Sequence, residues 1–321
     1  MTQKKSKGAI IGFGNIALLG HLPAFKALGV DIVAAVDVCE KRRDAAEKEG
    51  LSALRTLDEL EGLDIDFIDI CTPPSARFEP IRYAIERGLD VVCEKPVSTP
   101  GDFSKIKRLV LGSDVFVYPV HNWKHAPHYV KVKEMVVEKG GIENLQMNTM
   151  RTTYSSGNTD WNPAWRVDKK ISGGGIIMDH GYHNIYLAMH LFGSDFERAV
   201  LEDIDYYESN PGVEKRACFS LEFPGKRKAT ITLDWGASTR EIKNTIYECN
   251  SRLELSDKRI INSDHVYEFE ESLSGDSVHG RWYVPVFKDF LKQRKTKDKT
   301  HFKEAMKVLE GIDSLYQQAR K

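Results

Sequence analysis

A glycine-rich turn between two apolar runs constrains the fold of this chain more than any other feature. The run Ala9-Ile10-Ile11 leads into Gly12-Phe13-Gly14-Asn15-Ile16-Ala17, a helical pattern follows, and a second apolar run over residues 32–36 stops at Asp37. This order of strand, glycine-rich turn, helix, strand and acid is typical of a dinucleotide-binding unit. The sequence therefore predicts such a unit, and the alternative is a glycine-rich turn that binds nothing.

Each residue type in the turn has a physical purpose. Gly12 allows the tight turn, and Gly14 lacks a Cβ, so the backbone can approach a pyrophosphate closely. The N–H groups at the start of the following helix favour that anion. Asp37 can accept hydrogen bonds from both ribose hydroxyls of an adenosine and would repel a 2′-phosphate, which favours NAD. The cations at positions 41–43 could partly offset that repulsion, so NADP stays an alternative.

Composition excludes several classes of partner. The chain has 321 residues and a formal net charge of −1, which predicts about two domains and gives no electrostatic reason to expect nucleic acid or an anionic membrane. No run of about 18 apolar residues suggests a membrane span, and no apolar segment follows the basic start as in a signal peptide. The scattered cysteines form no CxxC pair, which indicates reduced thiols in a cytoplasmic protein. They are Cys39, Cys71, Cys93, Cys218 and Cys249.

The apolar pattern predicts two domains, over residues 1–121 and 122–321. In the first, near-continuous apolar runs alternate with helical patterns, which is typical of a doubly wound parallel Rossmann sheet. Its expected strands are 9–13, 32–37, 67–71, 91–94 and 115–119, and its expected helices are 16–28, 40–49, 75–87 and 102–111.

The second domain is expected to be α+β, built on an open, mostly antiparallel sheet, because its apolar residues alternate along longer strands. A hairpin is expected at residues 223–226. The expected strands are 144–153, 199–207, 215–223, 226–235, 241–249 and 266–270, and the expected helices are 126–139, 174–192, 282–294 and 302–319.

Two motifs follow expected strands of the first domain, where ligands of open α/β sheets bind. They are Cys71-Thr72-Pro73-Pro74 and Cys93-Glu94-Lys95-Pro96. Beside a bound cofactor, Lys95 can be partly desolvated, which would bring its pKa toward a range useful for proton transfer. The Lys95-Pro96 bond has an elevated chance of being cis, which would fix the direction of the lysine. The alternative is a solvated lysine at a strand end.

A third motif covers residues 172–183 and combines glycines with an acid and a histidine. Glycines 173–175 suit a close approach of the backbone to a ligand, and Asp179 and His183 are spaced to share one face of a helix. A carboxylate beside an imidazole can orient the ring and raise its basicity, so the pair could take a proton from a substrate hydroxyl as hydride leaves. The alternative is an ion pair on a helix surface.

Two further groups of side chains suggest contacts. His121, His125 and His128 surround Trp123, but their spacing matches no closed zinc pattern, so we expect no metal and a helix start that lines an inter-domain cleft. Trp161, Trp165 and Arg166 lie in the polar loop 152–170 and are expected to contact the substrate or the nicotinamide side; the alternative is ordinary loop packing.

On these residues the chain resembles the glucose–fructose oxidoreductase/inositol dehydrogenase/MocA family over nearly its full length. The resemblance rests on the glycine-rich turn, Thr72-Pro73-Pro74, Glu94-Lys95-Pro96, and Gly173-Gly174-Gly175 followed by Asp179 and His183. It implies hydride transfer between NAD, or NADP, and a secondary hydroxyl or ketone of a sugar, cyclitol or derivative. It also implies a homodimer or homotetramer formed through the C-terminal sheet.

The resemblance further implies residue roles. Lys95 would orient or protonate the reacting oxygen, His183 would be the acid/base, and Asp179 would support it. Asn122 falls where the family often has an Asn-x-Arg-x-x-Pro segment near the nicotinamide, although Lys124 stands in place of the arginine.

The expected cofactor-binding residues are Gly12, Phe13, Gly14, Asn15, Ile16, Asp37, Thr72, Pro73, Pro74, Glu94, Lys95 and Asn122. The expected catalytic residues are Lys95, Asp179 and His183, and Trp165 and Arg166 join them as expected substrate contacts. Two other functions fit the same sequence: a glycoside hydrolase that uses bound NAD in a redox-neutral cycle, and a non-catalytic regulator that senses NAD(P).

Overall fold

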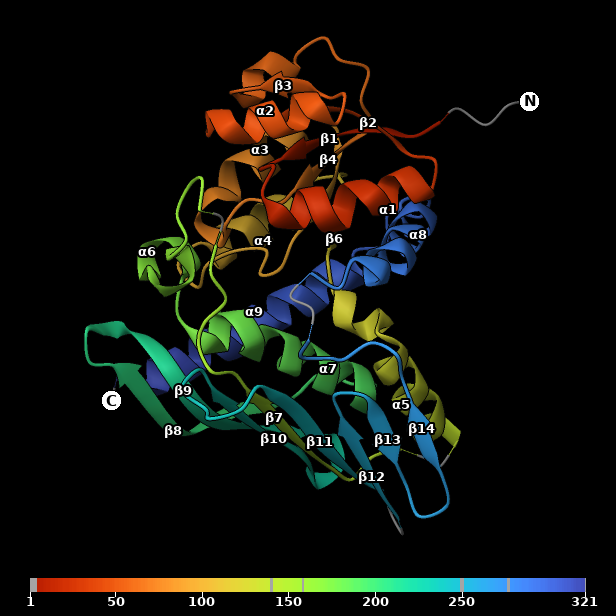
Figure 1. Ribbon diagram of the computed structural model, residues 1–321, viewed down its shortest axis with the longest axis vertical. Coiled ribbons are helices and arrows are strands. Elements are labelled where there is room, and N and C mark those ends of the chain that lie inside the picture. Colours follow the sequence, from red (N-terminus) through yellow and green to blue (C-terminus); the bar gives the residue numbers. More distant parts are fainter. Residues whose placement is uncertain (1–4, 139–140, 158, 249–250, 276–277, 321) are drawn as a thin grey trace. The chain divides into compact units, whose positions relative to one another are not determined.

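The chain divides into two compact units, whose segments alternate along the sequence. Figure 1 shows the computed structural model, which describes residues 5–138, 141–157, 159–248, 251–275 and 278–320. Within that part of the chain, unit 1 comprises the residues up to 122 together with 156–165 and 278–306, and unit 2 comprises 123–155, 166–277 and the residues from 307 onward. The division into domains at residue 121 stays a prediction.

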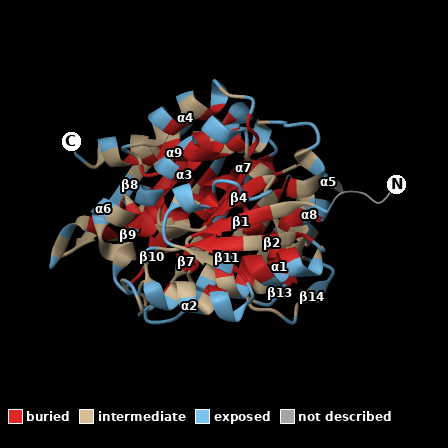
Figure 2. Ribbon diagram, turned by 90° about the horizontal axis from the view of Figure 1, so that it is seen from above, coloured by how far each residue is buried: buried red, intermediate tan, exposed pale blue. Residues whose placement is uncertain are grey.

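Unit 1 is built on a six-stranded parallel sheet, which confirms the doubly wound fold expected from the apolar runs. Its strand order is β3-β2-β1-β4-β5-β6, the order of two βαβαβ halves. The bounds are β1 Lys7–Ile11, β2 Asp31–Val36, β3 Ser52–Leu54, β4 Phe67–Ile70, β5 Asp90–Cys93 and β6 Val117–Pro119. Strands β1 and β4 are almost wholly buried (Figure 2), as expected for a sheet covered on both faces. Strand β3 was not expected, because three residues are too short for a recognisable apolar run.

The helices of unit 1 include one from late in the chain. They are α1 Leu22–Ala27, α2 Glu40–Lys48, α3 Phe78–Arg87, α4 Phe103–Leu111 and α8 Tyr283–Gln293, and a π-helical turn, Ala17–His21, precedes α1. The Phe287 ring of α8 stacks on Phe25 of α1 with centroids 4.0 Å apart. Burial of each such ring contributes about 1.5–3 kcal/mol. Helix α8 is therefore part of the core of unit 1.

Unit 2 is built on an eight-stranded sheet in the order β14-β13-β12-β11-β7-β10-β9-β8. The bounds are β7 Asn144–Met150, β8 Arg198–Tyr207, β9 Asn210–Phe223, β10 Arg227–Asp234, β11 Glu241–Glu248, β12 Ser251–Ser256, β13 Arg259–Ile261 and β14 Val266–Glu268. Its pairs are antiparallel except for β7 with β10. Buried and more exposed residues alternate along β11, so one face packs inward and the other is open. This confirms the expected open, mostly antiparallel sheet and the hairpin between β9 and β10.

Helices α5 Pro127–Glu138 and α7 Tyr182–Phe192 lie along one face of this sheet (Figure 1), and a π-helical turn, Ile177–Gly181, precedes α7. The short helix α6, Lys169–Ser172, is drawn apart from the sheet. Helix α9, Thr300–Gln318, begins in unit 1 and ends in unit 2. Nearly all of α7 is buried, in keeping with its mostly apolar sequence. The expected ends at Lys139 and Cys249 fall outside the described residues. Across the described helices, none is both long enough and apolar enough to span a bilayer.

Candidate active site

The two glycines of the turn in unit 1 have different surroundings. Gly12 has φ +90°, and a Cβ there would lie 2.9 Å from the backbone N of Thr72. Its N–H donates to the carbonyl of Val36 at 2.8 Å. A Cβ on Gly14, by contrast, would meet no atom within 4 Å. Gly12 is thus required by the fold, whereas the open space at Gly14 fits the expected approach of a pyrophosphate.

The acid at the end of β2 is fixed against this turn. Asp37 Oδ2 accepts the Phe13 N–H at 2.7 Å and Oδ1 accepts the Cys39 N–H at 2.8 Å. Each carboxylate oxygen can accept more than one hydrogen bond, so both can still receive ribose hydroxyls. The residues present therefore fit the adenosine half of a dinucleotide.

Arg77 ties together the two strand-end motifs. Its side chain is buried, its Nε donates to the Thr72 carbonyl at 2.8 Å, and its Nη1 donates to the carbonyls of Glu94 and Pro96. The Lys95-Pro96 bond is cis, in agreement with the expectation from the sequence. The Lys95 N–H donates to Glu94 Oε2 at 3.0 Å. The backbone that carries Lys95 is thus held from both sides.

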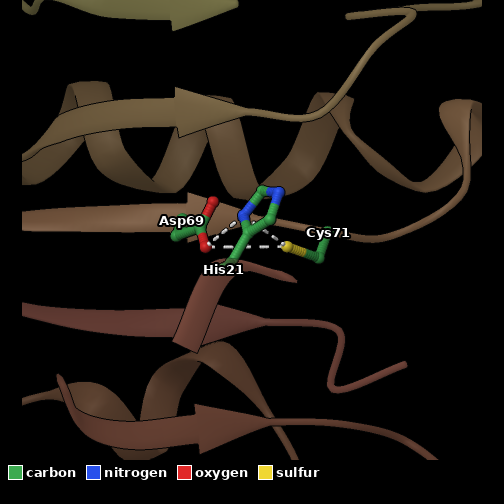
Figure 3. Close-up of side chains that lie close together, drawn as sticks. All are labelled: His21, Asp69 and Cys71. Carbon is green, nitrogen blue, oxygen red and sulfur yellow. Dashed lines mark hydrogen bonds and ion pairs between the residues drawn. The ribbon is translucent and has the colours of Figure 1, made fainter. Parts of the chain in front are cut away.

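A buried ionic network includes residues of these motifs. His21 Nδ1 lies 2.8 Å from Asp69 Oδ2, and both side chains are drawn with Cys71 in Figure 3. His21 Nε2 lies 3.1 Å from Glu94 Oε1. The Cys71 Sγ is 3.3 Å from the same Nδ1. His21 and Asp69 are completely buried and Glu94 is almost so. A histidine of the π-helical turn before α1 therefore bridges Asp69 of β4 and Glu94, which directly follows β5.

The charges of this network follow from burial and pairing. Burial alone would lower the pKa of His21, but the charge of Asp69 and the hydrogen bond to it raise that pKa well above its usual value. Burial would raise the pKa of Glu94, but the hydrogen bond and charge of His21 outweigh it and the pKa is lowered. Burial raises the pKa of the Cys71 thiol to about 12. We therefore assign His21 as an imidazolium between two carboxylates.

His21, Asp69 and Cys71 also have the geometry of a possible metal-ligand set. A metal would need a neutral imidazole and a thiolate, whereas Asp69 raises the pKa of His21 despite its burial, and burial raises the pKa of Cys71 to about 12. Hydrogen bonds among the three side chains already account for their closeness.

Helix α8 extends the network toward a predicted cofactor residue. The Tyr283 hydroxyl donates to Glu94 Oε1 at 3.3 Å, and the Asn122 amide donates to the Tyr283 oxygen at 3.4 Å. Sequence reasoning missed His21, Asp69 and Tyr283. One signal was present: Asp69 lies inside an otherwise apolar strand, and a buried carboxylate needs a partner.

In unit 2 the glycine segment packs against the chain itself. Glu214, fully buried, accepts the N–H groups of Gly175 and Ile177 at 2.8 and 3.0 Å and the Tyr316 hydroxyl at 2.7 Å. A Cβ on Gly174 would clash with the Tyr316 hydroxyl, and one on Gly175 with the Glu214 carbonyl. The expectation that these two glycines serve a close approach to a ligand is therefore corrected: they allow close internal packing.

His183 lies in an aromatic environment at the start of α7. Its side chain is buried, and Nδ1 is 2.8 Å from the Tyr186 hydroxyl, which accepts the Trp123 N–H at 3.1 Å. The Trp123 ring centroid is 5.0 Å from that of His183. The ring of His183 is therefore oriented by Tyr186 and packed against Trp123.

Asp179 lies in the π-helical turn that precedes α7. Its Oδ2 is 3.6 Å from Arg166 Nε and 3.8 Å from His180 Nε2, so two of the predicted substrate residues come together. A π turn takes up an extra residue, so a spacing of four does not by itself place Asp179 and His183 on one face. Their pairing stays a prediction.

The other singled-out side chains have local partners. His128 stacks on Phe269 with ring centroids 4.0 Å apart, and burial lowers its pKa to about 4. His121 Nδ1 lies 4.0 Å from Glu304. Trp161 is 46% exposed. The expected contacts of Trp165 with a substrate stay predictions.

Comparison with known proteins identifies the family. The family profile described as "Oxidoreductase family, NAD-binding Rossmann fold" matches residues 7–119, and the profile of the GFO/IDH/MocA C-terminal domain matches residues 129–255. The chain belongs to the GFO/IDH/MocA family. Its N-terminal part is therefore an NAD-binding Rossmann fold, as the open turn at Gly14 and the oriented Asp37 carboxylate indicate.

Curated members of the family align with part of this chain. An oxidoreductase of Formosa agariphila is 33% identical over 57% of the chain and 60% of its own length. Levoglucosan dehydrogenase of Pseudarthrobacter phenanthrenivorans is 31% identical over 58% of the chain and 50% of its length. The scyllo-inositol 2-dehydrogenase (NADP(+)) of Bacillus subtilis is 24% identical over 63% and 58%. The aligned parts thus span about half to three fifths of these relatives.

Solved structures share the fold. GenD2 from gentamicin A biosynthesis, in complex with NAD, has a TM-score of 0.84 at 18% identity, covering 100% of this chain and 96% of its own. Levoglucosan dehydrogenase in complex with NADH has a TM-score of 0.82 at 17% identity, covering 99% and 97%. At these identities the likeness concerns the fold alone.

Proposed function

We propose that this GFO/IDH/MocA protein is an NAD-dependent oxidoreductase that acts on a secondary hydroxyl, or the matching ketone, of a sugar or cyclitol. The observation that carries the proposal is the order of strands in unit 1. The glycine turn follows β1, Thr72 follows β4 and Lys95 follows β5, and these three strands are neighbours in one parallel sheet. Their carboxyl ends lie at one edge, so a cofactor held by the turn is beside the segment that carries Lys95.

Lys95 is suited to hold the reacting oxygen. Its backbone is fixed by Glu94, and the same turn is pinned by Arg77. An ammonium group in this position would stabilise a substrate oxygen, as negative charge develops on it, by a charge-assisted hydrogen bond. When bound, NAD supplies the hydride acceptor and NADH the hydride donor.

His183 is suited to exchange the proton of the substrate hydroxyl. Its Nδ1 lies 2.8 Å from the Tyr186 hydroxyl. With the ring proton on Nδ1 and donated to that hydroxyl, Nε2 would take the proton during oxidation and return it during reduction. Asp179, close to Arg166, would supply negative charge that favours the protonated ring. Trp165 and Arg166 would contact the substrate.

The names of relatives support the substrate class. One is a levoglucosan dehydrogenase and another a scyllo-inositol 2-dehydrogenase; both names denote polyhydroxylated rings. A cation and a general base beside a nicotinamide would act on a secondary hydroxyl of such a ring.

The decisive experiment is a substrate panel with matched variants. Sugars, cyclitols and their phosphate and nucleotide derivatives are assayed with NAD by the absorbance of reduced nicotinamide. On the active substrate, Lys95→Met and His183→Ala should each lower kcat by roughly 10²–10⁴-fold with NADH affinity retained. Lys105→Met, an exposed lysine of α4, is the control and should change neither quantity. Unchanged turnover in Lys95→Met and His183→Ala would reject the proposed roles.

The same assay separates the two alternative functions. A redox-neutral glycoside hydrolase would cleave a glycosidic bond with no accumulation of NADH and would retain its cofactor through desalting. An NAD(P)-sensing regulator would bind cofactor and turn over no member of the panel.

We also propose a homodimer or homotetramer formed through the open face of the unit 2 sheet, in the cytoplasm. Free cysteines at Cys39, Cys71, Cys93 and Cys218 suit a reducing compartment. Light scattering should give a mass of two or four chains, and Thr232→Arg on strand β10 should lower it. A monomeric wild-type chain would reject the assembly.

A further inference from the structure

A loop of unit 1 reaches the segment that follows the ribose-binding acid. Residues 156–165 belong to the same compact unit as the Rossmann sheet. Asp160 forms an ion pair with Arg42 Nη2, and its Oδ1 lies 3.9 Å from Lys41 Nζ. Its backbone carbonyl accepts the Cys39 thiol at 3.4 Å. Three successive contacts thus join Asp160 to residues 39–42.

The two arginines that could bind a 2′-phosphate, Arg42 and Arg43, already have partners within the protein. In dinucleotide-binding folds the acid after the second strand binds the ribose hydroxyls, whereas a nearby arginine accommodates the 2′-phosphate of NADP. Here Arg43 Nη1 donates to the carbonyls of Asp37 and Val38 at 2.9 and 3.0 Å. Arg42 is turned to Asp160, and its side chain is only 12% exposed.

We propose that Asp160 is a cofactor-selectivity residue, which favours NAD by holding the Arg42 guanidinium away from a 2′-phosphate. This inference rests on the proposed function, since it concerns the same dinucleotide site. Asp160 neutralises Arg42 in a partly buried ion pair, which weakens the attraction of the guanidinium for a phosphate. NADP would have to break the Arg42–Asp160 pair before it could gain an arginine contact.

The test measures cofactor binding directly and needs no substrate. Dissociation constants of NADH and NADPH are measured by nicotinamide fluorescence for the wild type and for Asp160→Asn, which keeps the side-chain shape and removes the charge. We expect NADPH to bind about tenfold more tightly to the variant, equal to about 1.4 kcal/mol, since one charge-assisted hydrogen bond becomes available. NADH affinity should change by less than about threefold.

Two further variants make the result specific. In the double variant Asp160→Asn/Arg42→Ala the gain for NADPH should disappear, because the gain depends on the released guanidinium. Asp64→Asn removes an exposed carboxylate that pairs with Lys7 and should leave the NADPH-to-NADH ratio unchanged.

The outcomes separate this inference from the proposed function. An unchanged ratio in Asp160→Asn, or a gain that persists without Arg42, would overturn the role of Asp160 while leaving NAD binding intact. A wild-type chain that binds neither nucleotide would instead reject the proposed function.

Discussion

Replacement of His21 by asparagine should expose how much unit 1 depends on its buried ionic network. Asparagine keeps hydrogen-bonding capacity but carries no charge, so the carboxylates of Asp69 and Glu94 lose the imidazolium that lies 2.8 and 3.1 Å from them. Removal of one partner from a buried ion pair costs about 3–5 kcal/mol, because the remaining charge stays buried without compensation. Here two carboxylates share the one lost cation, so the upper part of that range applies.

The cost should depend on pH with a defined sign. Because the pKa of His21 is raised in the folded state, its stabilisation is fully present below about pH 6.5, the unfolded value. It is lost as the pH rises through the folded pKa, at about 1.4 kcal/mol per pH unit. The pKa of Glu94 is lowered, so its stabilisation is present above about pH 4.5 and is lost as the pH falls. The difference in free energy of unfolding between the wild type and His21→Asn should therefore be largest between about pH 4.5 and 6.5.

Thermal unfolding of the two proteins at pH 5.5, 7.0 and 8.5 measures this difference. A loss of about 4 kcal/mol corresponds to a fall in midpoint of roughly 10 °C for a unit of this size, and the fall should shrink between pH 7.0 and 8.5. His265→Asn, at an exposed position, is the matched control and should shift the midpoint by less than about 1 °C. A difference that stays constant or grows above pH 6.5 would refute the assignment of His21 as a buried cation.

Three other substitutions or treatments test separate parts of the structure. Gly14→Val should weaken NADH binding, measured by fluorescence titration, by more than about tenfold, because its side chain enters the open space beside the turn. Its thermal unfolding midpoint should stay that of the wild type. A lower midpoint with unchanged NADH binding would contradict this. Gly175→Ala should destabilise unit 2 by about 1–3 kcal/mol, since its Cβ clashes with the Glu214 backbone. A midpoint equal to the wild type would disprove the packing. Cys93, which is buried and whose thiol pKa burial raises to about 12, should resist alkylation at pH 8 in the native protein, and rapid labelling detected by mass spectrometry would contradict its burial.

Local sequence patterns predicted much of unit 1, because the residues that define each of its elements lie close together along the chain. The turn at residues 12–17 needs small residues, the flanking strands need apolar runs, and the acid after β2 lies within the same βαβ unit. Strand β3 escaped prediction because its three residues, Ser52–Leu54, carry no usable period. Two strands of unit 2 were also missed: β12, Ser251–Ser256, and the three-residue β13, Arg259–Ile261.

The role of glycines 174 and 175 could not be read from composition. Glycine permits a close approach of any group, and the sequence does not say whether that group is a ligand or the chain. Only the packing of β9 and α9 against this segment brings Glu214 and Tyr316 to it. The same limit applies to Asp160, whose contact with Arg42 spans 118 positions.

The sequence by itself determined the dinucleotide-binding turn, the parallel sheet that follows from the alternation of apolar runs and helices, and the family. These depend on residues within one βαβ unit or one motif. The tertiary structure decided what holds Lys95 in place. Asp69 and Glu94 lie 48 and 73 positions after His21, and the three side chains meet only when β4 and β5 pair in the sheet and the turn that carries His21 packs beside them. It also decided that α8 completes the core of unit 1 and adds Tyr283 to the network. Burial is the physical reason: charges that look ordinary along the chain must be paired once the sheet removes them from water.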